Sequence, residues 1–164
     1  MITLGLSEIA IGDAELDGAM GTTLAPLGKT YRDTCKITQE DGEETEINSE
    51  EDDDPVYVIS RPGKIKIDFS ILDPEVDTLV ATLGGTKVGS GAAAVWQAPD
   101  SMPEVEKSIE ITPKIGMKLS IPRVKMNCKI DWSNVGTTPL LITVSGTVLV
   151  PTKPGEPKMK AVKV

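Results

Sequence analysis

The side chains that most often carry chemistry in proteins are scarce in this sequence of 164 residues. Histidine is absent, which removes the usual general base near neutral pH and the commonest metal ligand. The two cysteines, Cys35 and Cys128, lie far apart, whereas structural zinc requires closely spaced ligands. The sequence therefore predicts no zinc site. It favours two reduced, buried thiols over a disulfide, although the disulfide stays open.

Three short motifs have the outline of a binding loop. Asp41-Gly42-Glu43 resembles part of a calcium loop but lacks the alternating ligands. Gly84-Gly85-Thr86-Lys87 has the composition of a phosphate loop, but it follows the expected helix, so the helix N-terminus points away from it. We interpret the first motif as a solvated charge run and the second as a helix C-cap. Gly89-Ser90-Gly91 is interpreted as a hairpin turn.

No catalytic group can be nominated from the remaining residues. The carboxylates outside residues 40–54 stand singly on polar strand faces, so they offer no acid–base pair. No nucleophile motif surrounds any serine or lysine. We therefore expect a protein that is not an enzyme and that binds no metal or cofactor. A small enzyme built on a β-barrel is the disfavoured alternative.

The acidic character of the chain comes from one segment. The formal net charge is −8, yet of the 25 acids ten lie in residues 40–54, which leaves 15 acids against 17 bases elsewhere. Like-charge repulsion predicts a solvated, mobile hairpin or loop without affinity for nucleic acid. Its acids are Glu40, Asp41, Glu43, Glu44, Glu46, Glu50, Glu51, Asp52, Asp53 and Asp54.

Length and composition indicate one globular domain. Hydrophobic residues make up 39% and charged residues 26% of the chain, and only five residues are aromatic, so the core must be aliphatic. The N-terminus lacks the basic and apolar regions of a signal peptide. No stretch reaches the ~20 apolar residues that cross a bilayer. We expect folding in a cytoplasm and no membrane insertion.

Short alternating runs predict many strands and one helix. Asp41-Gly42 is expected to form a tight hairpin turn, with Thr45 and Ile47 in the return strand. The helix is expected over residues 73–84, with Asp73 as N-cap and Gly84-Gly85 at its end. Val76, Leu79, Val80 and Leu83 form its apolar stripe. The predicted strands are residues 2–11, 31–39, 56–60, 64–72, 86–88, 92–97, 104–112, 116–121, 123–132 and 140–150.

This pattern predicts a mainly β domain over residues 1–151, either a β-sandwich or a partly closed barrel, with one short flanking helix. Arg123, Lys125 and Lys129 alternate with apolar residues and form a cationic strand face. Residues 152–164 form a tail rich in proline and lysine, including Lys158 and Lys160, which we interpret as a linker or docking arm. Long strands with unprotected edges tend to pair with other chains.

The layout resembles the major tail tube proteins of long-tailed phages and the inner tube proteins of contractile injection systems, including type VI secretion. The resemblance rests on three stretches: residues 61–70, the capped helix with its following Gly84-Gly85-Thr86, and the apolar last strand over 140–151. It implies a β-sandwich subunit of the virion tail that forms hexameric rings. These rings stack into a hollow tube for DNA, assembled in the host bacterial cytoplasm.

The resemblance also implies the partners. The chain would bind itself, tail proteins such as the tape measure and terminator, and DNA only transiently in the lumen. An early loop that orders on stacking suits residues 40–54. We expect this loop to meet the basic tail or the Arg123–Lys129 face of another subunit. Alternatively, both charged segments merely keep free subunits in solution, or the chain is a surface module for adhesion or carbohydrate binding.

Overall fold

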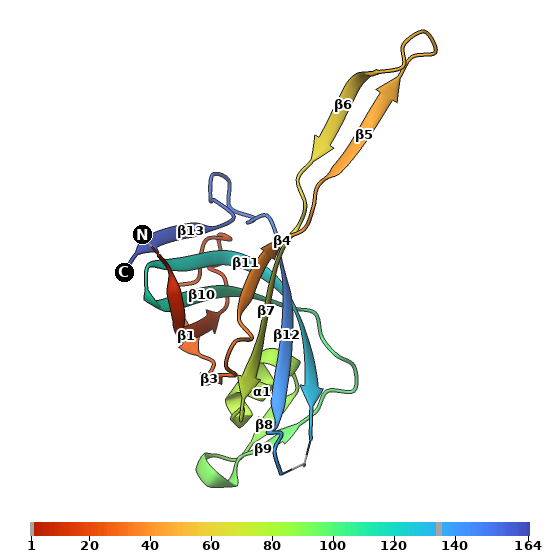
Figure 1. Cartoon of the computed structure of the whole chain (residues 1–164). Helices are drawn as coiled ribbons and strands as arrows, with labels where there is room; N and C mark the ends of the chain where they lie inside the picture. Colours follow the sequence, from red (N-terminus) through yellow and green to blue (C-terminus); the bar gives the residue numbers. More distant parts are fainter. Residues whose placement is uncertain (1, 134–135) are drawn as a thin grey trace.

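The chain is mainly β, and its strands form one large antiparallel sheet and two separate hairpins (Figure 1). A computed structural model describes residues 2–133 and 136–164. The sheet runs in the order β2-β1-β10-β11-β12-β7-β3, with β13 attached to β11 and β4 to β7. Its strands are β1 (Leu4–Gly12), β2 (Ala25–Pro26), β3 (Lys29–Thr30), β4 (Lys36–Gln39), β7 (Ile65–Leu72), β10 (Val105–Ile115), β11 (Met117–Asp131), β12 (Leu141–Val148) and β13 (Lys160–Lys163).

The two hairpins lie at opposite ends of the molecule (Figure 1). One pairs β5 (Glu43–Asn48) with β6 (Pro55–Arg61), and the other pairs β8 (Thr86–Val88) with β9 (Val95–Gln97). A single turn of 3₁₀-helix, η1 (Gly91–Ala93), connects β8 to β9. The hairpin predicted around Gly89-Ser90-Gly91 is therefore confirmed, with a wider loop than a tight turn.

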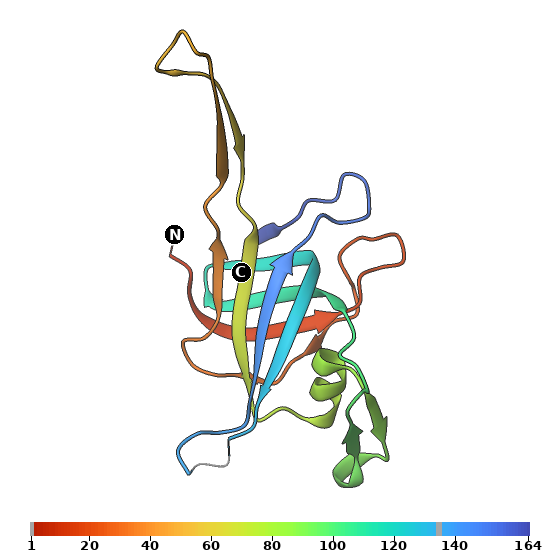
Figure 2. The same ribbon diagram turned by 90° about the vertical axis from the view of Figure 1, so that its right-hand side faces the viewer.

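Strand β11 carries the chain from one layer into the other. It pairs first with β10 and β13 and later with β12. Figure 2 shows β1 crossing the direction of β7 and β12, as in sandwiches whose strands bend from one sheet into the next. The pairing order of the described strands ends at β2 and β3, so the sheet does not close. The predicted fold class, a β-sandwich with one short helix, is confirmed.

The bend in β11 lies at Pro122, which cannot donate a ladder hydrogen bond. Opposite it, the register of β10 shifts between Lys107 and Ile109. The fully buried Ser108 compensates, because its hydroxyl donates to the Pro122 carbonyl at 2.6 Å and accepts from the Gly21 amide at 3.0 Å. Two sequence runs that predict separate strands, 116–121 and 123–132, are thus one bent strand.

The core is aliphatic apart from Phe69, as composition predicts. Strand β7 shows the predicted alternation, and Ile67, Phe69 and Ile71 on its apolar face belong to the core cluster. The most completely buried large side chains are Ile9, Ile67, Phe69, Ile71, Leu83, Ile109, Ile121, Val124, Ile142 and Val144.

Helix α1 (Val76–Leu83) begins later than predicted. Asp73 is not its N-cap, because Asp73 has a left-handed backbone with φ of 47° and its amide binds the Leu140 carbonyl at 3.2 Å. Asp73 therefore serves the turn that leaves β7. Glu75 occupies the N-cap position without a capping side-chain hydrogen bond.

The C-terminal end and the inner face of α1 agree better with the prediction than its start does. Gly84 ends the helix with φ of 75°, and Leu79 and Leu83 are buried as predicted. Thr78 and Thr82, however, are more deeply buried than Val76 and Val80. The Thr82 hydroxyl donates to the Thr78 carbonyl at 2.7 Å, which satisfies it inside the core. None of the helices in the described chain is long and apolar enough to cross a membrane.

Two segments differ from the expected strands. The run over 31–39 is interrupted: β3 ends at Thr30, Asp33 has φ of 61°, and only residues 36–39 form β4. The tail, in contrast, gains a strand that the sequence did not predict. Residues 160–163 pair with 117–120 of β11 as β13 and remain exposed, whereas Met159 just before them packs against the core cluster.

Candidate functional site

The acidic segment forms a long ribbon that projects from the body (Figures 1 and 2). We call residues 43–61 the arm; it consists of β5, β6 and the turn between them. Every residue of the arm is exposed except Ser49, which is half-buried. Glu43, Glu44 and Glu46 lie on β5, and the five consecutive acids from Glu50 to Asp54 lie at the tip.

The hairpin turn predicted at Asp41-Gly42 is wrong. Strand β5 does not return along β4; it continues away from the body and pairs with β6, while β4 pairs with β7. Gly42 does not have the positive φ that a two-residue hairpin turn requires. The reversal takes place at residues 49–54, where five neighbouring carboxylates can separate into water.

The arm leaves the body through a narrow neck, formed by residues 40–42 and 62–64. The Glu40 amide donates to the Lys64 carbonyl at 2.9 Å, and the Glu40 carboxylate pairs with Lys66. This hydrogen-bonded pairing lowers the pKa of Glu40. The two strands approach so closely that a Cβ on Gly63 would lie 1.8 Å from the Glu40 carbonyl oxygen. Glycine at the neck therefore permits a close crossing that another side chain would block.

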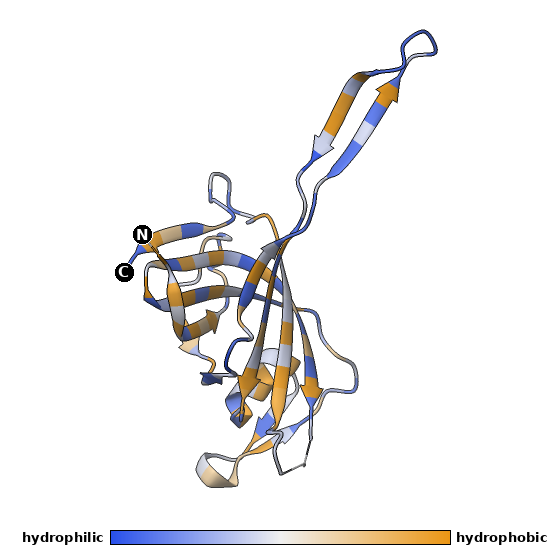
Figure 3. Cartoon of the chain, viewed as in Figure 1, coloured by the Kyte–Doolittle hydropathy of each residue, from blue (hydrophilic) through white to orange (hydrophobic). Residues whose placement is uncertain are grey.

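The arm has two chemically different faces. Cross-strand pairing places Thr45 beside Ile59 and Ile47 beside Tyr57 on one face. The opposite face is mixed, with Glu44 beside Ser60 and Glu46 beside Val58. Ile47, Tyr57 and Ile59 are 50%, 63% and 41% exposed, and Figure 3 shows hydrophobic residues along both arm strands. An apolar face of this kind ordinarily packs against something, and within the described chain nothing covers it.

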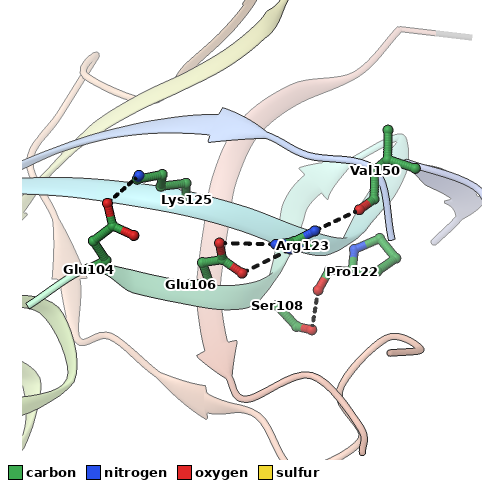
Figure 4. Close-up of polar contacts among 7 residues, drawn as sticks. All are labelled: Glu104, Glu106, Ser108, Pro122, Arg123, Lys125 and Val150. Carbon is green, nitrogen blue, oxygen red and sulfur yellow. Dashed lines mark hydrogen bonds and ion pairs between the residues drawn. The ribbon is translucent and has the colours of Figure 1, made fainter. Parts of the chain in front are cut away.

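The predicted cationic face is mostly neutralised. The Arg123 guanidinium binds both carboxylate oxygens of Glu106, at 2.8 and 3.1 Å, and the Val150 carbonyl at 3.2 Å (Figure 4). Lys125 binds Glu104 at 2.7 Å. These four charged residues form an ion-pair ladder across β10 and β11. The hydrogen bonds from Arg123 lower the pKa of Glu106.

The other predicted basic residues lie apart from the acidic arm. Lys129 is exposed on β11 and has no ion pair among the described residues. Lys160 is on β13 and binds Glu156 at 2.9 Å, whereas Lys158 is exposed before that strand. Within the described residues, the only acid of the 40–54 segment in an ion pair is Glu40, at the neck. A contact between the acidic and basic segments therefore requires a second molecule.

Sequence reasoning missed the partners of the cations and the apolar face of the arm. Glu104 and Glu106 precede Arg123 by many residues, and only the pairing of β10 with β11 brings them together. The uninterrupted apolar run over 56–59 signals burial, and in the structure this run lies on the exposed β6. A buried-strand signal in an exposed strand indicates a surface that becomes covered on association.

The described residues, 2–133 and 136–164, contain no group of three His, Cys, Asp or Glu side chains arranged to hold a metal ion. Cys35 and Cys128 are both unpaired and half-buried. Burial raises the pKa of Cys128 to about 12 and also raises the pKa of Cys35, so neither is a reactive thiolate near neutral pH.

No protein-family model and no curated protein matches the sequence. The features of the molecule that point to a function are the arm and the surfaces of the sheet. Its chemistry is that of non-covalent association: backbone edges, an uncovered apolar ribbon and separated charges.

Proposed function

We propose that the chain is a structural subunit of a phage-type tail tube, which associates into hexameric rings that stack around a lumen for DNA. Its main partner is itself, with tape-measure and terminator proteins at the ends of the tube. The tube belongs to the virion tail and assembles in the bacterial cytoplasm. The single observation that carries the proposal is the arm.

The arm favours association because an isolated two-stranded ribbon is at best marginally stable in water. It exposes Ile47, Tyr57 and Ile59 on one face and receives no support from the rest of the described chain. Burial of each such side chain against a partner contributes on the order of 1–3 kcal/mol. A projecting ribbon with an uncovered apolar face supports a role in binding another subunit.

The sheet supports a role around DNA. The outward residues of β12 are Thr143, Ser145 and Thr147, whose hydroxyls carry no charge. On the neighbouring strand, Glu104 and Glu106 neutralise Lys125 and Arg123. Lys129, on the same face opposite Thr143, is the exception, because it has no ion pair among the described residues. Phosphate contacts with free cations hold DNA in place, so a face with few free cations suits a lumen through which DNA slides.

The test compares the wild type with an armless variant, in which an Asn-Gly turn replaces residues 44–60. Glu43 and Arg61 are opposed in register, so a two-residue turn can join them. Sedimentation velocity and negative-stain imaging across rising concentration should show rings and tubes for the wild type. The armless variant should fold but fail to elongate.

A control variant keeps the arm and neutralises its tip through Glu50→Gln, Glu51→Gln, Asp52→Asn, Asp53→Asn and Asp54→Asn. This variant separates the contribution of the ribbon to assembly from the contribution of its charge. A wild-type chain that stays monomeric at every concentration and salt would contradict the proposal. If the armless variant forms tubes, the proposed self-assembly is supported, but the arm has no role in it.

A further inference from the structure

A second surface of the molecule has the complementary character to the arm. An open groove of about 1140 Å³ lies between the β1–β10–β11 side of the body and the β3–β4 side. Its lining is largely apolar, and two of these side chains, Ile37 and Met117, are 39% and 45% exposed. The large aliphatic lining residues are Leu6, Ile37, Leu72, Ile111, Met117 and Leu119.

The polar part of the groove is basic. Lys29, Arg32 and Lys114 line it, against one acid, Asp33. Arg32 and Asp33 form a pair at 3.8 Å with both side chains more than nine-tenths exposed, so that pair holds Arg32 weakly. Neither Lys29 nor Lys114 has an ion pair among the described residues. The groove therefore offers two uncompensated cations beside an apolar floor.

The arm combines the opposite charge with an apolar face. It carries eight acids and one base, Arg61, together with its apolar face. The arm extends away from its own body (Figures 1 and 2), so it does not reach its own groove. Another pair of exposed apolar residues, Val88 and Val95 of the β8–β9 hairpin, lies beside Lys87, whose charge is held by Asp77 at 2.8 Å.

We propose that the groove between β1–β10–β11 and β3–β4 receives the arm of a second copy of this chain. The face with Ile47, Tyr57 and Ile59 lies on the apolar lining, and the acids at the tip of the arm, residues 50–54, are attracted by Lys29 and Lys114. The contact is heterologous, because arm and groove are different surfaces of one chain, so it propagates from copy to copy. This inference rests on the proposed self-association and names the surface that accepts the arm.

The first test uses charge reversal. Lys29→Glu with Lys114→Glu should weaken self-association about tenfold or more, because like charges then face each other across the contact. Lys129→Glu with Lys158→Glu makes the same change in net charge outside the groove and should leave self-association near the wild-type level. All four lysines are exposed, so neither pair of changes disturbs the core.

The second test uses complementation. The armless variant retains the groove, and the Lys29→Glu, Lys114→Glu variant retains the arm. The acids of that intact arm should fit the intact groove of the armless chain. At a concentration too low for the weakened self-association of either variant, each alone should stay monomeric, whereas their mixture should form a one-to-one complex that grows no further. Sedimentation equilibrium measures the stoichiometry of both samples and of the mixture.

The third test compares the two faces of the arm. Val58 and Ile59 are equally exposed, at 41% each, but point to opposite faces. Ile59→Ser should weaken binding, and Val58→Ser should not. If only the variant with Lys129→Glu and Lys158→Glu fails to assemble, the groove is not the surface that receives the arm, but association through the arm remains supported. If the wild type itself remains monomeric, both the groove and the proposed function fail.

Discussion

Two glycines at the neck determine how the arm leaves the body. Gly42 and Gly63 lie where the two strands cross, and a Cβ on either would come within 2.4 Å of a backbone oxygen of the opposite strand. Backbone atoms cannot rotate away as a flexible side chain can. The direction of the arm therefore depends on these two positions.

Gly63→Ala is expected to deform the neck and to abolish self-association while the body stays folded. Overpacking of this kind costs on the order of 1–3 kcal/mol. The measurements are sedimentation velocity for association and chemical denaturation for stability. Gly136→Ala is the matched control, because an added Cβ there has nothing within 4 Å. Unimpaired assembly of Gly63→Ala would show that the neck tolerates a displaced arm.

The ion-pair ladder illustrates the limit of sequence reasoning at the residue scale. Alternation correctly places Arg123, Lys125 and Lys129 on one face of β11. Whether that face is cationic depends on the neighbouring strand, and Glu104 and Glu106 lie there only because of the β10–β11 register. Local periodicity carries no information about that register.

At the scale of elements, a strand or helix is predicted correctly where the period of its apolar residues matches the face that is buried. Strand β7 alternates apolar and polar residues and lies between two strands, so periodicity alone identifies its inner face. The helix is predicted in place and in its end at Gly84. The start of the helix is predicted wrongly, because the Asp73 amide binds the carbonyl of Leu140, which is distant in sequence. This tertiary contact overrides the local capping preference.

Helix α1 is expected to depend on its buried leucines. Leu79 is 7% exposed and packs in the core cluster, so Leu79→Ala should cost on the order of 2–5 kcal/mol of stability. Chemical denaturation monitored by circular dichroism measures this loss. Val80→Ala, at a half-buried position of the same helix, should cost less. Equal losses for the two variants would contradict the assignment of the inner face.

The arm is the element for which local signals mislead most. Asp-Gly is a strong hairpin signal, and the sequence offers it eight residues before the observed reversal begins at Ser49. The longer ladder of β5 with β6 prevails because it pairs six residue positions and keeps the acids apart. Only long-range pairing, which no local pattern encodes, distinguishes the two hairpins.

At the scale of the whole molecule, charge and apolar surface are segregated. The arm holds eight of the acids, whereas the described lysines without an ion pair lie on the body and the tail, including Lys29 and Lys114 at the groove and Lys129 on β11. Association of such molecules combines electrostatic attraction with apolar burial, and the two contributions respond differently to salt. Sodium chloride screens exposed charges, with a Debye length near ~10 Å at 0.1 M and ~3 Å at 1 M. Sulfate strengthens apolar burial.

Self-association should therefore weaken as sodium chloride rises from low concentration toward 1 M, and it should recover in ammonium sulfate of equal ionic strength. Single exposed pairs contribute only ~0–1 kcal/mol, but the contacts act together when many copies assemble. Light scattering at fixed protein concentration measures the effect. The variant with five neutral tip residues should lose much of the chloride response and keep the sulfate response, because its apolar face is unchanged. A wild-type protein whose association is indifferent to chloride would show that the acidic arm binds through its apolar face alone.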